Sequence, residues 1–252
     1  MHNLISILKI TLIISWTEII IKYRKSIIGP FWIVFNMSIV VFSLSFVFAG
    51  FFGKGFNDYV LYIYCGILGW SFISNLISES TNLYINGSIK NFKFHTFYLP
   101  LVNVNKILII FFHNFIVYFI LIIFIKDTFY LYNLIYIFIA LLIYIFNGIC
   151  ISFSIGLLSL RFRDLGFMIS NILYLIFLIT PIFWDPKILS QKRAFIVEFN
   201  PFFHFIEILR RPLLGEAPNL ENFLYVIILT LFNIFLAYVT YRKLNKYKYF
   251  YL

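Results

Sequence analysis

The side chains that most often carry out enzyme chemistry are few in this sequence and lie far apart. The four histidines, none of which pairs with another at metal-ligand spacing, are His2, His95, His113 and His204. The chain contains no GxxxxGK(S/T) phosphate-binding loop, no GxGxxG turn and no GxSxG nucleophile turn. Cys65 and Cys150 lie within long apolar runs, which favours a packing role over a disulfide framework or a CxxC site. The sequence therefore predicts no catalytic residue, no cofactor site and no metal site in this chain.

Aromatic rings are more abundant, since Phe, Tyr and Trp make up 22% of the residues. Two stripes recur near helical spacing, one at Trp32, Phe35, Phe42 and Phe46, the other at Phe167, Tyr174, Phe177, Pro181 and Trp184. Such stripes are often core or lipid-facing surface, which is one interpretation. The other is a conduit lined by rings, because flat apolar rings contact the C–H faces of sugars without holding a sliding polymer in a deep polar well.

The chain that carries these residues has the composition of a membrane protein. Of its 252 residues, 62% are hydrophobic and 12% are charged, and the mean hydropathy is +0.95. Soluble domains average about 45–50% apolar and about 25% charged residues, and disordered chains need low hydrophobicity with high charge. The composition excludes both classes and predicts an all-α integral membrane protein.

Stretches without charged residues predict six membrane-spanning helices. A spanning helix needs about 20 predominantly apolar residues, and we place the spans at about 31–53, 59–79, 107–125, 131–160, 165–184 and 222–241. No repeat or linker interrupts them, so we expect one transmembrane domain over residues 26–252. The uncharged gaps lack the ionisable relays typical of ion-driven carriers. If the protein moves a solute uphill, we expect the energy to come from another chain.

Residues 1–25 are apolar but do not predict a clean span. Polar side chains fall on one helical face, at Asn3, Ser6, Thr11, Ser15, Glu18, Lys22 and Lys25. The other face carries Leu4, Ile5, Leu8, Leu12, Ile19 and Ile20. This pattern predicts an amphipathic helix lying in the membrane interface. The alternative, a signal peptide, lacks a basic n-region and an A-x-A-like cleavage site.

Lys and Arg predict the orientation. With both termini on one side, the whole net charge of +10 falls on that side, which predicts cytoplasmic termini and explains the basic character without nucleic acid. Two connections are long: residues 79–106 on the predicted cytoplasmic side and residues 185–221 outside. Within the latter, Phe202–Leu214 is too short for a span and predicts a re-entrant or interfacial helix.

Four segments together resemble motifs of ABC-2-type exporter permeases, in particular the branch that exports O-antigen, capsule and teichoic acid polysaccharides. They are Tyr23–Trp32 (YRKSIIGPFW), Arg161–Asp164 (RFRD), Thr180–Trp184 (TPIFW), and Asn200-Pro201 followed by Glu207, Arg210 and Leu213–Gly215. The likeness covers nearly the whole chain, in order. Any one motif is weak, but four in register with six spans are fairly specific.

The resemblance implies a half-transporter in the cytoplasmic (inner) membrane. Two copies would form the pathway for a lipid-linked glycan among the membrane lipids, and two copies of a separate ATPase would bind ATP and Mg, with no nucleic acid involved. The ATPase-coupling segment would include Asn82, Lys90, Lys93, Phe94 and Pro100. The outer gate would include short re-entrant helices with Asn200, Pro201, Glu207 and Arg210.

We therefore expect a permease that exports a lipid-linked polysaccharide, powered in trans by ATP. Three alternatives remain at this point: the same fold with a drug or small lipid as cargo, a membrane enzyme of glycan assembly, and a scaffold subunit without transport activity. An enzyme would show carboxylates or histidines clustered at one membrane face, and the sequence shows no such cluster.

Overall fold

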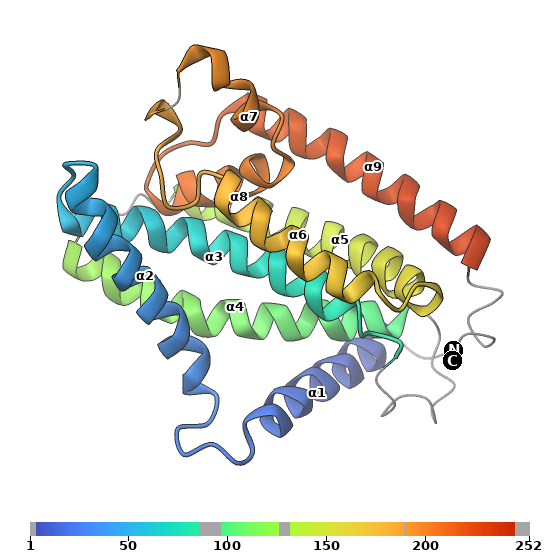
Figure 1. The fold of residues 1–252 in the computed structure, drawn as a ribbon. Helices are drawn as coiled ribbons and strands as arrows, with labels where there is room; N and C mark the ends of the chain where they lie inside the picture. Colours follow the sequence, from blue (N-terminus) through green and yellow to red (C-terminus); the bar gives the residue numbers. More distant parts are fainter. Residues whose placement is uncertain (1–3, 86–96, 126–131, 189, 245–252) are drawn as a thin grey trace.

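The computed structural model describes residues 4–85, 97–125, 132–188 and 190–244. The described residues form helices joined by turns, with no strand among them, which confirms the predicted all-α class. The long helices are α1 (Leu4–Tyr23), α2 (Phe31–Phe51), α3 (Phe56–Ser80), α4 (Tyr98–Ile125), α5 (Tyr132–Arg161), α6 (Leu165–Ile179) and α9 (Leu220–Leu244). Between α6 and α9 lie the short helices η2 (Pro186–Ile188), η3 (Gln191–Arg193), α7 (Phe195–Glu198) and α8 (Pro201–Leu213) (Figure 1).

Five of the described helices, α2, α3, α4, α5 and α9, are long and apolar enough to cross a membrane. The fifth predicted span differs, because residues 165–184 do not form one continuous helix. α6 ends at Ile179 after 15 residues, about 22 Å at about 1.5 Å per residue, which is shorter than the ~30 Å hydrocarbon core. Thr180 is extended (φ −78°, ψ 132°), which is the conformation that the residue before a proline favours.

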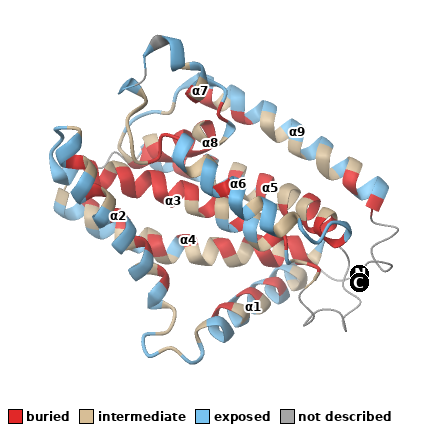
Figure 2. Cartoon of the chain, viewed as in Figure 1, coloured by how far each residue is buried: buried red, intermediate tan, exposed pale blue. Residues whose placement is uncertain are grey.

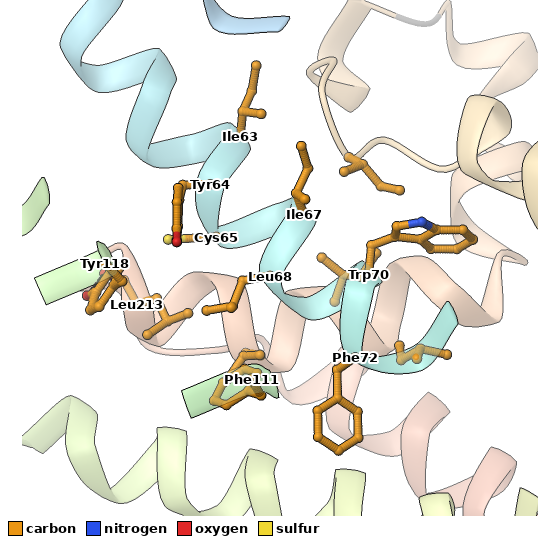
Figure 3. Packing of buried hydrophobic residues seen from close by; sticks show 14 of the residues in the cluster. Ile63, Tyr64, Cys65, Ile67, Leu68, Trp70, Phe72, Phe111, Tyr118 and Leu213 are labelled. Atoms are coloured by element: carbon orange, nitrogen blue, oxygen red, sulfur yellow. Dashed lines mark hydrogen bonds between the residues drawn. The ribbon is translucent and has the colours of Figure 1, made fainter. Parts of the chain in front are cut away.

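The core is built around α3. Within its most apolar window 78% of the residues are buried, against 11% for α9, and Figure 2 shows the same contrast between a mostly red α3 and an outer α9. Figure 3 shows large side chains leaving α3 in several directions. Phe72 meets Phe111 of α4 edge-on at 5.8 Å between ring centroids, and Tyr144 of α5 at 5.1 Å. α3 is therefore the helix against which α2, α4, α5, α6 and α8 pack, whereas α1 packs on α4 and α9 packs on α5 and α8.

The N-terminal segment forms a helix with the predicted polar face, and that face packs on protein. Thr11 and Ser15 are fully buried against α4. The Ser15 hydroxyl donates to the carbonyl of Val102 at 2.8 Å, and the amide of Asn105 donates to the Thr11 hydroxyl oxygen at 3.0 Å. The apolar side of α1 is exposed instead, at Ile5, Leu8, Leu12, Ile13 and Ile20, although Ile19 from the predicted apolar face is buried. Placement of α1 in the membrane interface stays a prediction.

Candidate functional site

Beyond the end of α6, residues 180–185 form a non-helical segment that we call the strap. Its carbonyl groups have left the helical hydrogen-bond ladder, and Pro181 supplies no N–H of its own. A buried backbone carbonyl without a donor is costly. The carbonyl of Thr180 accepts the N–H of Ile182 at 2.7 Å, and the carbonyls of residues 181–184 need donors from elsewhere in the protein. The strap therefore requires partners that its own sequence does not contain.

Side chains from three other regions donate hydrogen bonds to successive residues along the strap. Asn200 Nδ2 donates to Thr180 Oγ1 (2.9 Å), and Arg210 Nη1 donates to the carbonyls of Pro181 (2.9 Å) and Ile182 (3.4 Å). On α3, the Tyr59 hydroxyl donates to the carbonyl of Phe183, and the Tyr62 hydroxyl donates to the carbonyl of Trp184 (3.3 Å). Before α3, Lys54 Nζ donates to the Asp185 carboxylate (2.8 Å). Six consecutive residues are thus fixed to α3, to α8 and to the turn before α3.

Arg210 is the central donor of this set. Its side chain is 2% exposed and bonds to Glu207 one turn earlier on α8, with Nε 2.6 Å from Oε1. The guanidinium carbon lies 4.4 Å from the centroid of the Tyr62 ring. Glu207 also lies 3.3 Å from Arg211 Nε. Arg210 therefore binds both the strap and the Glu207 carboxylate. Loss of one partner of a buried ion pair strongly destabilises a protein, so we expect the fold to depend on Arg210.

The start of α8 is tied to the strap through one residue. Asn200 caps α8, because its Oδ1 accepts the backbone N–H groups of Phe202 (3.0 Å) and Phe203 (3.3 Å), and Pro201 occupies the first helical position. The amide of the same side chain reaches Thr180. The structure therefore gathers Asn200, Glu207 and Arg210 around the strap, as neighbours in space.

Gly66 of α3 allows the strap to approach the core. A Cβ atom at this position would lie 2.8 Å from the carbonyl oxygen of Ile182 and 3.3 Å from Arg210 Nη1. The first distance is shorter than van der Waals contact, and the atom it meets is backbone. The absence of a side chain at Gly66 therefore sets how closely the strap lies against α3.

The other predicted segment, between α3 and α4, is described only at its ends. Asn82 lies exposed in the turn after α3, and Pro100 is buried in the first turn of α4. Lys90, Lys93 and Phe94 lie outside the described residues. The start of the connection packs against α5: a Cβ atom at Gly156 would lie 2.7 Å from Tyr84 Cε2. Tyr84 belongs to an apolar cluster with Leu99, Phe153, Leu157, Leu160 and Leu244.

A group of charged residues joins the two ends of this connection. Lys106 Nζ lies 3.0 Å from Glu79 Oε2 in the last turn of α3 and 3.0 Å from Glu18 Oε2 on α1. We call Glu18, Glu79 and Lys106 the charge clasp. Lys22 Nζ lies 3.8 Å from Glu79 at its edge. The Lys106 side chain is 16% exposed and both carboxylates are 37% exposed, so the cation is enclosed by its two partners.

The aromatic stripes divide into exposed and packed rings. Trp32, Phe35, Phe42 and Phe46 on α2, and Tyr174 on α6, are exposed. Phe177 is packed instead, 5.7 Å from the ring of Trp70 and 5.6 Å from that of Phe183. Trp184 donates its ring N–H to the carbonyl of Leu178 at 3.3 Å. The exposed rings are available to line a pathway, and that role stays a prediction.

Sequence reasoning missed the strap donors Lys54, Tyr59 and Tyr62. The available signal was Lys54, just beyond a predicted span, followed by Tyr59 and Tyr62. Two residues three positions apart lie on the same face of a helix. Glu18, Glu79 and Lys106 were counted as charges but not expected to pair. Within the described ranges, no three His, Cys, Asp or Glu side chains lie together as metal ligands would.

The comparisons with known proteins come from sequence. No protein-family model matches the chain. Two curated proteins of Klebsiella pneumoniae, each named O-antigen export system permease protein RfbA, are 26% identical to it in an alignment that covers 98% of this chain and 95% of theirs. The chain is thus a multi-pass membrane protein similar over almost its whole length to O-antigen export permeases, transporter subunits rather than enzymes, and this confirms the resemblance predicted from its four motifs.

Proposed function

We propose that this protein is the permease subunit of an ABC transporter that exports a lipid-linked polysaccharide across the cytoplasmic membrane. The observation that carries the proposal is the end-to-end similarity to the two O-antigen export permeases. ATP is hydrolysed by a separate subunit, which docks on the side that holds both termini. Two copies of the permease face one another to form the pathway.

The exposed rings of α2 and α6 support a pathway of this kind. Trp32 and Phe35 lie edge-to-face with centroids 5.4 Å apart, and Tyr174 is exposed on α6. Rings offer a broad and shallow attraction to sugar C–H faces, which suits a chain that has to slide. The polymer passes between two such surfaces, one from each copy.

The strap and α8 form the outer gate in this proposal. Asn200 and Arg210 tie the strap to α8, and Tyr59 ties the strap to α3, so the three move as a unit. The connection between α3 and α4 receives the stroke of the ATPase. Because α3 leads into the connection and carries the strap donors Tyr59 and Tyr62, it links the ATPase side to the gate.

Depletion of the protein in its own cells tests the proposal. Loss of the permease should leave lipid-linked glycan inside the cell, measured as glycan that an antibody or lectin labels only after permeabilisation. Complementation with the wild-type gene should restore surface labelling. Surface glycan at the normal level after depletion, together with altered sensitivity to drugs, would reject the proposal in favour of a drug or small-lipid cargo.

A further inference from the structure

The charge clasp suggests a role for α1 that rests on the proposed function. We infer that Lys106 makes α1 part of the coupling machinery: α1, the start of α4 and the base of the α3–α4 connection move as one body when the ATPase acts. Lys106 is a positioning residue in this scheme, because it holds two helices to the connection and touches no substrate.

The position of the clasp is the first argument. Glu79 stands one residue before the end of α3, and Lys106 lies in the third turn of α4, so their contact closes the base of the connection. Glu18 brings α1 to the same ammonium group. A movement of the connection that also displaces Lys106 therefore displaces α1 as well.

The second argument is the register between α1 and α4. Three polar contacts join them along one face: Thr11 with Asn105, Ser15 with the Val102 carbonyl, and Glu18 with Lys106. They extend from Thr11 to Glu18, eight residues of α1 and about 10 Å of helix. Sliding α1 along α4 breaks all three at once, and two of these α1 side chains, Thr11 and Ser15, are fully buried. The contact between these helices is therefore fixed.

The third argument concerns what α1 reaches. Its exposed side carries large apolar residues such as Ile5, Leu12 and Ile20, which suit contact with lipid. At its other end the chain turns at Gly29 (φ +56°) and continues into α2, which carries four of the exposed rings. A stroke that enters at the connection thus reaches the lipid boundary and the ring-bearing helix through α1.

A reversible cross-link tests whether α1 and α4 move together. In the double variant Thr11→Cys/Asn105→Cys, the new thiols replace side chains whose polar atoms lie 3.0 Å apart. The oxidised protein, with bond formation confirmed by thiol titration, should export glycan as fast as its reduced form. Each single cysteine variant is a matched control. Loss of export on oxidation, restored by reduction, would overturn the inference.

Neutral and conservative changes at Lys106 test the clasp. Lys106→Met, with normal yield and normal binding to the ATPase, should hydrolyse ATP at the basal rate but export glycan about fivefold more slowly or worse, as expected for lost coupling between sites. Lys106→Arg should retain export, because it still faces both carboxylates. Normal export by Lys106→Met would overturn the inference. Failure of the wild-type protein to export glycan in the same assay would instead reject the proposed function.

Discussion

The strap and the charge clasp solve opposite problems at two ends of α3. The strap is non-helical backbone, and three of its donors, Asn200, Arg210 and Tyr59, are buried. The clasp is a set of partly exposed charges, and Lys106 holds two carboxylates from different helices. Losing a strap donor leaves a carbonyl without a partner, whereas exposed ion pairs contribute little to stability. We conclude that the strap contacts mainly stabilise the fold, whereas the clasp can transmit movement between helices at little cost in stability.

The strap and the start of the α3–α4 connection each pack over a glycine. Gly66 lies under the Ile182 carbonyl of the strap, and Gly156 of α5 lies under the ring of Tyr84 at the start of the connection. The first neighbour is backbone and the second is a side chain. The same added methyl group should therefore damage stability at one end and coupling at the other.

The largest effect is expected from removing the central strap donor. Arg210→Met leaves the carbonyls of Pro181 and Ile182 without this donor and the buried Glu207 carboxylate with Arg211 as its remaining partner, and should cost about 3–5 kcal/mol of stability. Thermal unfolding in detergent measures the loss. Arg211→Met is the matched control one residue away, with a partly exposed side chain, and should cost less than about 1 kcal/mol. Equal losses in the two variants would contradict the role given to Arg210.

Gly66→Ala should have the next largest effect on stability, because the added methyl group would lie 2.8 Å from the Ile182 carbonyl oxygen. The strap has to shift, at a cost of about 1–3 kcal/mol. Thermal unfolding and export are both expected to fall. Gly50→Ala on α2 is the control, since no atom lies within 4 Å of its added Cβ. A Gly66→Ala protein as stable as wild type would show that the strap is not held closely.

Gly156→Ala should reduce export more than stability, because it displaces Tyr84 from its contact on α5. The expected signature is near-normal yield and unfolding temperature with slower export per ATP hydrolysed. Replacing Tyr84 by the smaller Leu in the same protein should recover part of the export. If Gly156→Ala instead unfolds the protein as readily as Gly66→Ala, the proposed difference between the two ends fails.

The smallest effect concerns the exposed end of the strap. Partial burial of the Asp185 carboxyl opposes its ionisation, but hydrogen bonds from Lys54 and from the Lys187 backbone N–H outweigh this and lower its pKa. A carboxyl with a lowered pKa stabilises the fold at neutral pH, and that contribution disappears as the pH falls through the folded-state pKa. Asp185→Asn should therefore unfold slightly earlier than wild type at neutral pH, with the difference vanishing in acid. A difference that grows in acid would contradict this sign.

Several features follow from local sequence and were predicted correctly. Uncharged apolar runs predicted all-α membrane structure, and the four motifs predicted the similarity to O-antigen export permeases. Thr180-Pro181 was recognised as a motif, yet it was placed inside a continuous span. The residue before a proline is biased away from the helical conformation, but this bias does not by itself end a helix, because α8 continues through Arg211 and Pro212.

Tertiary structure alone decided which groups meet. Glu18 and Lys106 are 88 residues apart and Lys54 and Asp185 are 131 apart, and no periodicity relates them. Periodicity likewise gave α1 a polar face but not its neighbour, because a polar face is satisfied equally by water and by the hydrogen-bonding groups of another helix. Helices follow from backbone geometry and composition within the chain itself. The partners of the strap and of the clasp follow only from how those helices pack around α3.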